Sequence, residues 1–348
     1  MAAAPAVNAM ANAARPQSQA RRQRLLAMLS DGAFYSGEEL AKRLRISRGG
    51  VWKLVRALRT MGVQVESAPR QGYKLPGAVD LLDGRVILDA LSSSARERLD
   101  RLDVLLTVDS TNRFVADAPT TEQARAHVCV AELQTAGRGR RGRSWVAPFG
   151  SGVCLSLGWR FAEAPPTFSA LSLAVGAAAV RALRRFGVHD VGLKWPNDLI
   201  RQGRKLAGIL IEMRGESAGP AHVVIGIGVN TRLPASARLS LAEQQAALAT
   251  DLHELLQERT PTRNELIAAL VDEMISMLHV FTKEGFAAFI DEWRRLDTLA
   301  DAQVKVINGA QTLLGVARGV DGDGGLLVEI DGRVQKFISG EVTLRRGG

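Results

Sequence analysis

Apolar residues recur along the chain in patterns that change from one third to the next. Val51, Val55 and Leu58 follow the i, i+4, i+7 spacing of a helix that buries one face. From about residue 103, short continuous apolar runs begin, which are typical of buried strands. Residues 300–348 show five short apolar alternations, with hairpin-turn signals at Asn308-Gly309 and Asp331-Gly332. The pattern predicts a helical first part, a mixed middle part and a β part at the end.

The first part has the pattern of a helix-turn-helix. Residues 21–30 are expected to form a short helix. Ser36 and Glu39 have the capping-box spacing at the start of a second helix, and Ser47 caps a third that runs to about Met61. Two short helices separated by a tight turn, with a basic second helix, are typical of DNA-binding modules.

A hairpin is predicted over residues 63–75, with Arg70 in its loop as part of a basic wing. This indicates the winged form of the motif, and a helical hairpin that makes protein contacts is the alternative. Trp52 could instead belong to the core. The residues expected to contact operator DNA are Arg48, Gly49, Trp52, Lys53 and Arg70.

Charge is distributed unevenly along the chain. The net charge is +9, and residues 1–80 contain 13 Lys or Arg and 5 Asp or Glu, which is 13 − 5 = +8. A basic segment on a nearly neutral body indicates a polyanionic partner, although solubility alone would also explain it. Residues 1–20 are Ala-rich, contain no acidic residue and lack a signal-type apolar stretch, so we expect a disordered tail. The two cysteines exclude a disulfide scaffold, and we expect a cytoplasmic protein without a membrane span.

The middle part mixes strands and helices without strict alternation, which favours an α+β fold. Helices are expected over residues 168–186 and within about 262–295. Strands are expected over residues 104–108, 128–133, 153–159, 191–194, 206–213 and 223–229.

A glycine- and arginine-rich segment, Gly-Arg-Gly-Arg-Arg-Gly-Arg-Ser-Trp, occupies residues 137–145. It matches a dinucleotide-binding fingerprint literally, but Pro148 and Gly150 follow closely where that fingerprint needs a helix. A nucleic-acid arm is a second interpretation, although such arms are usually tails. A third is a mobile loop that closes over a small phosphorylated ligand, with glycines allowing close approach and arginines supplying charge.

Three further motifs make the third interpretation specific. Residues 194–198 read Lys-Trp-Pro-Asn-Asp, residues 205–210 read Lys-Leu-Ala-Gly-Ile-Leu, and residues 226–230 read Gly-Ile-Gly-Val-Asn. With residues 110–112, Ser-Thr-Asn, and the arginine-rich segment, they occur in the order found in biotin protein ligases. The chain resembles the bifunctional biotin protein ligase / biotin operon repressor family over about residues 22–348.

The resemblance implies a biotin–[acetyl-CoA-carboxylase] ligase that also represses transcription. Biotin and ATP would form biotinyl-5′-AMP, with Mg²⁺ carried by the ATP phosphates rather than by a protein metal site. Biotin would then pass to a lysine of a biotin carboxyl carrier protein. Operator DNA is the second implied partner, and a homodimer is implied for the adenylate-bound state.

The resemblance also implies the site residues, position by position. Lys194, Lys205, Arg138 and Arg140 are the expected catalytic cations. Biotin or the adenylate would contact a wider set, namely Ser110, Thr111, Asn112, Gln134, Gly137, Arg138, Gly139, Arg140, Arg143, Trp145, Lys205, Gly208 and Asn230. Structural roles stay open, because residues 110–112 could cap a helix, Trp145 and Trp195 could be core residues, and Asp198 could accept bonds in a turn.

The implied architecture has a winged helix-turn-helix over residues 21–80, a catalytic domain of the biotin/lipoate ligase type over 81–298 and a small SH3-like β-barrel over 299–348. Residues 231–260 contain no aromatic residue, whereas the family can supply an adenine-packing aromatic there, so leucines are the candidates. The alternatives are a biotin sensor without ligase chemistry, a ligase whose N-terminal domain no longer binds DNA, and a lipoate ligase.

Overall fold

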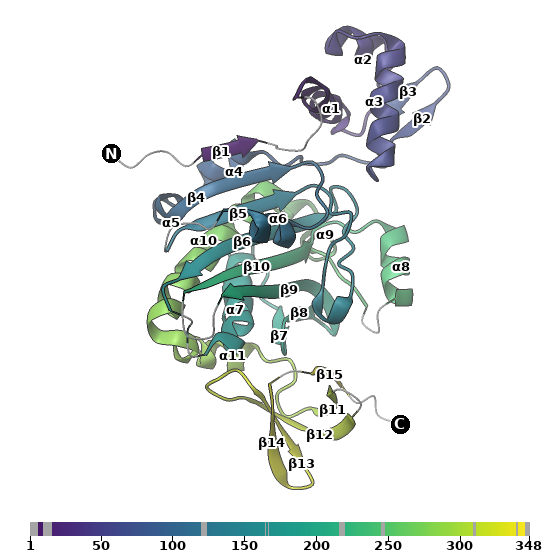
Figure 1. The fold of residues 1–348 in the computed structure, drawn as a ribbon. Coiled ribbons are helices and arrows are strands. Elements are labelled where there is room, and N and C mark those ends of the chain that lie inside the picture. The colour runs from purple at the N-terminus through teal and green to yellow at the C-terminus, as the bar shows by residue number, and fades with distance from the viewer. Residues whose placement is uncertain are drawn as a thin grey trace.

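The computed structural model describes residues 6–9, 16–119, 124–163, 165, 167–215, 220–244, 248–308, 311–338 and 340–344. Figure 1 shows a small helical part at the N-terminus, a large sheet with helices, and a small β part near the C-terminus. Among the described residues no helix is long and apolar enough to span a membrane. The predicted three-part α+β architecture is confirmed.

The N-terminal part packs three helices against a short hairpin. Its elements are α1 (Pro16–Leu29), α2 (Gly37–Leu44), α3 (Arg48–Thr60), β2 (Glu66–Ala68) and β3 (Gly72–Lys74). The predicted stripe on the third helix is buried and joins leucines of the first two helices in one core. The winged helix-turn-helix predicted from the spacing is therefore present.

Both helices of the motif begin at serine caps. The Ser36 hydroxyl accepts a hydrogen bond from the Glu39 backbone N–H at 3.1 Å, and the Ser47 hydroxyl accepts one from the Gly50 N–H at 3.1 Å. The reciprocal half of the predicted capping box is not formed, since the Glu39 carboxylate pairs with Arg43 at 2.6 Å.

Arg59, at the end of α3, uses its side chain to bind the hairpin that forms the wing. Its guanidinium donates two hydrogen bonds to the Val65 carbonyl, at 2.9 and 2.7 Å, and one to the Ser67 hydroxyl at 3.1 Å. This fixes the hairpin against the helix that precedes it.

The N-terminal tail differs from its prediction. Composition predicts disorder through residue 20, but Ala6–Ala9 form strand β1, and helix α1 already begins at Pro16. Strand β1 pairs in parallel with β4 (Leu99–Leu105). A sheet edge presents unpaired backbone N–H and C=O groups, and a short segment can satisfy them whatever its composition.

The large sheet runs β1-β4-β5-β6-β10-β9-β8-β7 among the described residues. The three strands β1, β4 and β5 are parallel neighbours, and the other neighbouring pairs are antiparallel. The remaining strands are β5 (Ala126–Ala131), β6 (Gly152–Phe161), β7 (Gly192–Lys194), β8 (Asp198–Arg201), β9 (Arg204–Gly215) and β10 (Ala221–Asn230).

Helices cover the two faces of this sheet unequally. The main core lies between the sheet and α7 (Leu171–Arg184) and α10 (Arg263–Glu284). The opposite face carries the short helix α6 (Thr111–Asp117), which packs on β5, β6 and β10 over a small core of its own. The other helices are α4 (Gly84–Ala90), α5 (Ser93–Arg98), α8 (Ala235–Gln244), α9 (Leu252–Leu256) and α11 (Ile290–Leu296). The face that carries α6 therefore keeps room for a cavity.

Besides β1 and the start of α1, sequence patterns missed a second strand of this sheet and misplaced a second helix start. Strand β8 is short and has Asp198 and Arg201 at its ends, so it reads as a turn. The helix expected from residue 168 begins with a 3₁₀ turn, Phe168–Ala170, before α7. Both deviations come from short segments whose pairing depends on distant neighbours.

Five antiparallel strands form the C-terminal part, in the order β14-β13-β12-β11-β15. They are β11 (Gln303–Asn308), β12 (Gln311–Val320), β13 (Leu326–Ile330), β14 (Arg333–Phe337) and β15 (Glu341–Leu344). Asp331 and Gly332 have φ values of 49° and 75°, as the predicted two-residue hairpin turn requires. The other predicted turn, at residues 308–309, extends outside the described residues.

A buried arginine joins the N-terminal part to the sheet. The Arg263 guanidinium, on α10, lies 2.8 Å from the Glu132 carboxylate and 3.2 Å from that of Asp80. Arg263 is 1% exposed, so its charge depends on these two partners. Arg263 therefore links the two parts through one buried ion pair, with Glu132, and one partly exposed pair, with Asp80.

Candidate functional site

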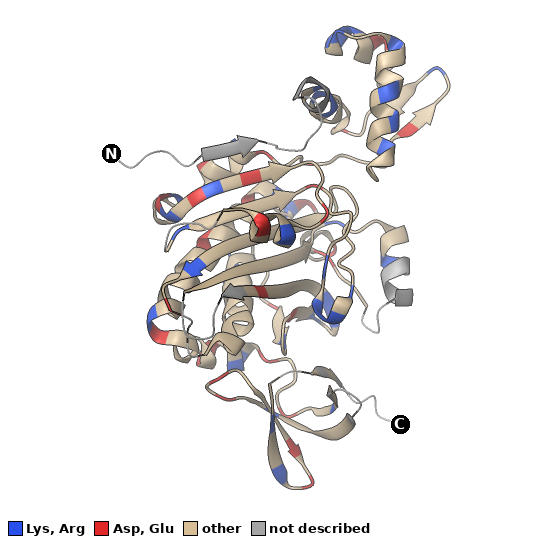
Figure 2. Cartoon of the chain, in the orientation of Figure 1, with Lys and Arg blue, Asp and Glu red and all other residues tan. Residues whose placement is uncertain are grey.

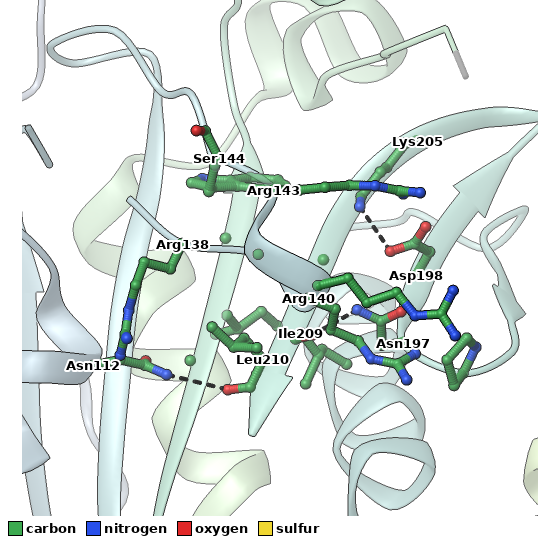
Figure 3. A pocket seen from close by; sticks show the side chains of 18 of the residues that line it. Asn112, Arg138, Arg140, Arg143, Ser144, Asn197, Asp198, Lys205, Ile209 and Leu210 are labelled. Atoms are coloured by element: carbon green, nitrogen blue, oxygen red, sulfur yellow. Dashed lines mark hydrogen bonds and ion pairs between the residues drawn. The ribbon is translucent and has the colours of Figure 1, made fainter. Parts of the chain in front are cut away.

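A cavity of about 680 Å³ lies on the face of the large sheet that carries α6. Its wall includes residues 138–145, which we call the arginine loop, and both predicted lysines, Lys194 and Lys205. Gly340 and Val342 of the C-terminal part complete it. Figure 3 shows Arg140 and Arg143 of the loop extending toward Lys205 and Asp198, and Arg138 lying beside Asn112. The structure thus brings the predicted cations to one cavity.

The arginine loop is a narrow turn closed by backbone hydrogen bonds. The Trp145 N–H donates to the Gly137 carbonyl at 2.9 Å, and the Gly139 N–H donates to the Arg143 carbonyl at 2.7 Å. Between them lies a single 3₁₀ turn, Arg140–Gly142, in which Arg141 has φ 57°. No helix begins here, so the dinucleotide-binding interpretation is wrong.

Three glycines on adjacent strands form the floor of the cavity. A Cβ on Gly226 would lie 2.2 Å from Asn112 Oδ1, and one on Gly228 would lie 2.2 Å from the Trp145 ring. A Cβ on Gly208 would lie 3.1 Å from Lys205 Nζ. These glycines therefore provide the space into which Asn112 and Trp145 fit.

The start of α6 and the segment after β5 together present a polar row, Ser110, Thr111, Asn112 and Gln134. The Thr111 N–H donates to Gln134 Oε1 at 2.8 Å. Ser156, buried on β6, has its hydroxyl 2.6 Å from Asn112 Oδ1 and 2.7 Å from Thr111 Oγ1. Ser110 occupies the N-cap position of α6, but its side chain makes no capping bond. Ser110, Thr111, Asn112 and Gln134 line the cavity, and Ser156 is fully buried next to them.

Lys205 stands on β9 between a carboxylate and an aromatic ring. Its Nζ lies 2.7 Å from Asp198 Oδ1 and 5.6 Å from the centre of the Trp145 ring. Asp198 is thus an ion-pair partner of Lys205 on the cavity wall rather than only a turn acceptor. Trp145 is partly buried and lines the cavity, with its ring on the glycine floor.

Lys194 ends β7 and opens the turn that carries Trp195 and Asn197. The Asn197 side chain donates to the Ile209 carbonyl at 2.7 Å, which fastens this turn to β9. Trp195 is 2% exposed, so the core interpretation holds for it. Its indole N–H donates to the Gly324 carbonyl at 3.0 Å and ties the turn to the C-terminal part.

Two predicted site residues do not line the cavity. Gly137 directly precedes the arginine loop and pairs with Trp145 at its far end, and a Cβ there would lie 2.4 Å from the Trp145 carbonyl oxygen. Asn230 is 4% exposed, and its amide donates to the carbonyls of Lys205 and Thr250 at 3.4 and 3.0 Å. In this arrangement both support residues that do reach the cavity.

Ser144 and Asn197 line the cavity although they were not predicted as site residues, and sequence reasoning also missed two polar residues that bond to predicted ones. Glu212 receives hydrogen bonds from Arg138 and Asn112, and Ser156 bonds to Asn112 and Thr111. Each is a single polar residue in an apolar strand run, and this is its only signal in the sequence. The strand period places Glu212 on the same face as Gly208, which is how it could have been found.

The cavity offers charge rather than a nucleophile. Cys154 lines it, but burial raises the pKa of this thiol to about 11, so it stays neutral at physiological pH. Histidine is absent from the described lining. The site can therefore gather anions and hold them in position.

The predicted DNA-contacting residues all lie on the surface of the N-terminal part. Arg48, Gly49, Lys53 and Arg70 are exposed, and Trp52 is 51% exposed, which excludes a core role for it. The Arg56 guanidinium lies 5.5 Å from the Trp52 ring centre. Figure 2 shows basic residues distributed along the length of α3. This arrangement is typical of a recognition helix.

A cation-lined cavity on a mixed sheet, preceded by a winged helix and followed by a β domain, defines a ligase of the biotin and lipoate type. Residues 104–230 match the model of the biotin/lipoate A/B protein ligase family, residues 21–74 that of an HTH domain, and residues 302–345 that of the biotin protein ligase C terminal domain. The chain belongs to the bifunctional biotin protein ligase family.

Individual relatives agree with this assignment. The bifunctional ligase/repressor BirA of Escherichia coli is 38% identical over 324 residues, which is 92% of this chain and 96% of the relative. A biotin–[acetyl-CoA-carboxylase] ligase of Mycobacterium tuberculosis is 34% identical over 268 residues, 75% of this chain and 95% of the relative. The structure of the Aquifex aeolicus biotin protein ligase in complex with biotin and ATP aligns with a TM-score of 0.57 at 26% identity, covering 71% of this chain and 99% of that chain.

Proposed function

We propose that this protein is an ATP-dependent biotin protein ligase that also acts as a biotin-responsive transcriptional repressor. The observation that carries the proposal is the convergence of the arginine loop, Lys194 and Lys205 on one cavity. Membership of the bifunctional family supports both halves of the function.

The first reaction joins two anions, and this explains the site. A biotin carboxylate oxygen attacks the α-phosphorus of ATP, a new O–P bond forms, and the bond to the bridging oxygen of the β-phosphate breaks. Pyrophosphate leaves and biotinyl-5′-AMP remains. Because both reactants are negatively charged, positioning and charge neutralisation carry the catalysis.

The roles of individual residues follow from their places on the wall. Lys194, Lys205 and Arg140 would neutralise the carboxylate and the α-phosphate. Trp145 would contact the adenine. Biotin's head group would meet the polar row of Ser110, Thr111, Asn112 and Gln134, while Gly139, Arg143 and Gly208 would surround the adenylate.

Mg²⁺ would be bound by the ATP phosphates. When bound, it would supply further neutralisation of their charge. The described residues hold no group of three or more His, Cys, Asp or Glu side chains that could bind a metal ion by themselves. Asp198 on the cavity wall fits such a cation, since carboxylate oxygens are ligands that Mg²⁺ prefers.

In the second reaction, a lysine amine of the carrier protein attacks the carbonyl of the mixed anhydride, an amide forms and AMP leaves. The acceptor would be a biotin carboxyl carrier protein of acetyl-CoA carboxylase. Because the adenylate is prone to hydrolysis, closure of the arginine loop over it would exclude water until the acceptor arrives.

Repression would follow from the exposed surface of α3 and its wing on operator DNA. Adenylate binding would favour a homodimer, which presents two winged helices to a palindromic site. Sedimentation at micromolar protein with and without biotin and ATP tests this step. An unchanged mass would argue against the dimer.

The decisive assay measures pyrophosphate release with biotin, ATP and Mg²⁺, followed by transfer of labelled biotin to a carrier domain. We expect both activities. A biotin sensor without ligase chemistry would bind biotin and release no pyrophosphate. A lipoate ligase would release pyrophosphate with lipoate in preference to biotin.

A further inference from the structure

Glu212 lies on β9, two residues beyond Leu210 of the cavity wall, and two site residues converge on it. Arg138 Nη2 donates to both carboxylate oxygens, at 2.6 and 2.7 Å, and Asn112 Nδ2 donates to Oε2 at 2.9 Å. One carboxylate thus joins the arginine loop to the polar row at the start of α6.

The direction of Arg138 distinguishes it from the other arginines of its loop. In Figure 3 its guanidinium points down toward Asn112, whereas Arg140 and Arg143 extend toward the side of Lys205 and Asp198. Arg138 therefore does not join the cations on that side. Its side chain attaches the first arm of the loop to β9.

Asn112 has little freedom to adopt another orientation. Its amide donates to Glu212 and to the Leu210 carbonyl, at 2.9 and 3.3 Å, while its oxygen lies 2.6 Å from the Ser156 hydroxyl. Gly226 lies directly beneath it, where a Cβ would come within 2.2 Å of the amide oxygen. The Glu212 carboxylate is thus one of three groups that together fix which way this amide faces, and the one that also binds the arginine loop.

We propose that Glu212 is a positioning residue that anchors the arginine loop through Arg138 and orients the biotin pocket through Asn112. The proposal rests on the ligase function proposed above and adds a residue to it. Loop closure and head-group recognition then share one carboxylate, so the loop is held over the same pocket whose contents it must retain.

Exposure separates this role from a contribution to fold stability. The side chains of Arg138 and Glu212 are 48% and 32% exposed, and ion pairs at that exposure contribute little to unfolding free energy. Removing the charge should therefore leave the melting temperature nearly unchanged. The substitution should instead change how firmly the arginine loop is attached and how much adenylate is lost to water before biotin is transferred.

Two substitutions separate the two contacts. Glu212→Gln keeps an amide oxygen that can accept from Asn112 but removes the charge that holds Arg138. Glu212→Ala removes both contacts. Glu329→Gln is the matched control, because Glu329 pairs with Arg318 at 2.9 Å in the C-terminal part with side chains 41% and 37% exposed.

The first measurement is the rate of trypsin cleavage within the arginine loop, without biotin or ATP. Every variant keeps the same arginines, so the rate reports how firmly the loop is attached. We expect Glu212→Gln to be cleaved at least about threefold faster than the wild type and Glu329→Gln to match the wild type. Equal cleavage of Glu212→Gln and wild type would overturn the anchoring role.

The second experiment measures two quantities for each variant: the KM for biotin, and the amount of pyrophosphate released per biotin transferred. For Glu212→Gln we expect the KM within about twofold of the wild type and a pyrophosphate ratio raised about threefold or more, because an unanchored loop loses adenylate to water. For Glu212→Ala the KM should rise about tenfold as well, as for the loss of a charge-assisted hydrogen bond.

A general structural defect would lower both reactions together and leave that ratio unchanged, which would contradict the proposal. A KM equal in Glu212→Ala and Glu212→Gln would contradict the role at Asn112. If the wild type releases no pyrophosphate with biotin, the ligase function itself fails. The cleavage experiment still decides whether Glu212 anchors the loop.

Discussion

Lys205 and Asp198 face each other on the cavity wall, with 2.7 Å between the ammonium nitrogen and the carboxylate oxygen. They belong to two motifs that are close in sequence, but their meeting depends on the pairing of β8 with β9. The Asp198 carboxylate holds the Lys205 ammonium group beside Trp145, where the biotin carboxylate and the α-phosphate are proposed to meet.

Substitution of either cavity lysine should abolish the first reaction without unfolding the protein. We expect Lys194→Met and Lys205→Met each to lower biotin-dependent pyrophosphate release by about 100-fold or more, as for the loss of a preorganised charge at a transition state. Lys42→Met, which removes an ion pair with Glu38 on α2, should retain the wild-type rate. Near-normal release by both cavity variants would refute the assignment.

The two glycines beneath Asn112 and Trp145 should affect different substrates, because Asn112 is proposed to contact biotin and Trp145 the adenine of ATP. A methyl group at Gly226 would displace Asn112, so Gly226→Ala should raise the KM for biotin by about tenfold or more. A methyl group at Gly228 would displace Trp145, so Gly228→Ala should raise the KM for ATP more than that for biotin.

Steady-state kinetics with each substrate varied in turn check this pair. Gly322→Ala is the control, because a Cβ there would meet nothing within 4 Å and its φ is ordinary. If the two floor variants shifted both constants equally, the division of the cavity into a biotin half and a nucleotide half would be wrong.

The exposed surface of α3 predicts a loss of DNA affinity that salt can diagnose. Arg48→Ala should weaken operator binding by about tenfold and reduce the slope of log affinity against log salt by about 1, if Arg48 contacts a phosphate. Arg43→Ala, which removes the pair with Glu39 on α2, is the control in the same gel-shift titration. Ligase activity should be unchanged in both variants.

Asp297, between α11 and β11, should make the free energy of unfolding depend on pH. Burial raises the pKa of its carboxyl to about 6, and its Oδ1 accepts from the Leu299 N–H at 2.9 Å. The folded protein therefore holds this proton while the unfolded chain releases it above its ordinary pKa. The free energy of unfolding is therefore highest at acid pH and falls by about 1–3 kcal/mol as pH rises through about 6.

Asp297→Asn should thus raise the free energy of unfolding at about pH 8 and have little effect at about pH 4, because asparagine keeps the oxygen that accepts from Leu299. Urea unfolding followed by tryptophan fluorescence measures this difference. Asp331→Asn, at an exposed hairpin turn, should show no such dependence on pH. A gain at acid pH would contradict the sign argued here.

Local patterns predicted most of the elements correctly for identifiable reasons. The stripe of Val51, Val55 and Leu58, and the serine caps, are short-range signals, and the helices they predict are present. The turn at Asp331 and Gly332 is likewise a local choice of residues with positive φ. Strand β1 and strand β8 were missed because both depend on a partner strand that lies far away in the sequence.

The site likewise has features that local sequence could predict and features that depend on packing. Lys194, Lys205 and the arginines stand in contiguous motifs, so the sequence alone could nominate them. Asn230 was nominated from its motif, yet its amide faces the carbonyls of Lys205 and Thr250. Motif position predicts proximity to a site, whereas the direction of a side chain depends on the packing around it.

The sequence by itself determined the three-part order, the basic recognition helix and the set of cations for a reaction between two anions, since each is encoded in residues that are neighbours along the chain. Only the tertiary structure decided that Arg138 turns to Glu212, 74 residues away, and that glycines beneath Asn112 and Trp145 clear the space they occupy. Those relationships arise between strands, and the register that aligns them is set by the core of the whole sheet.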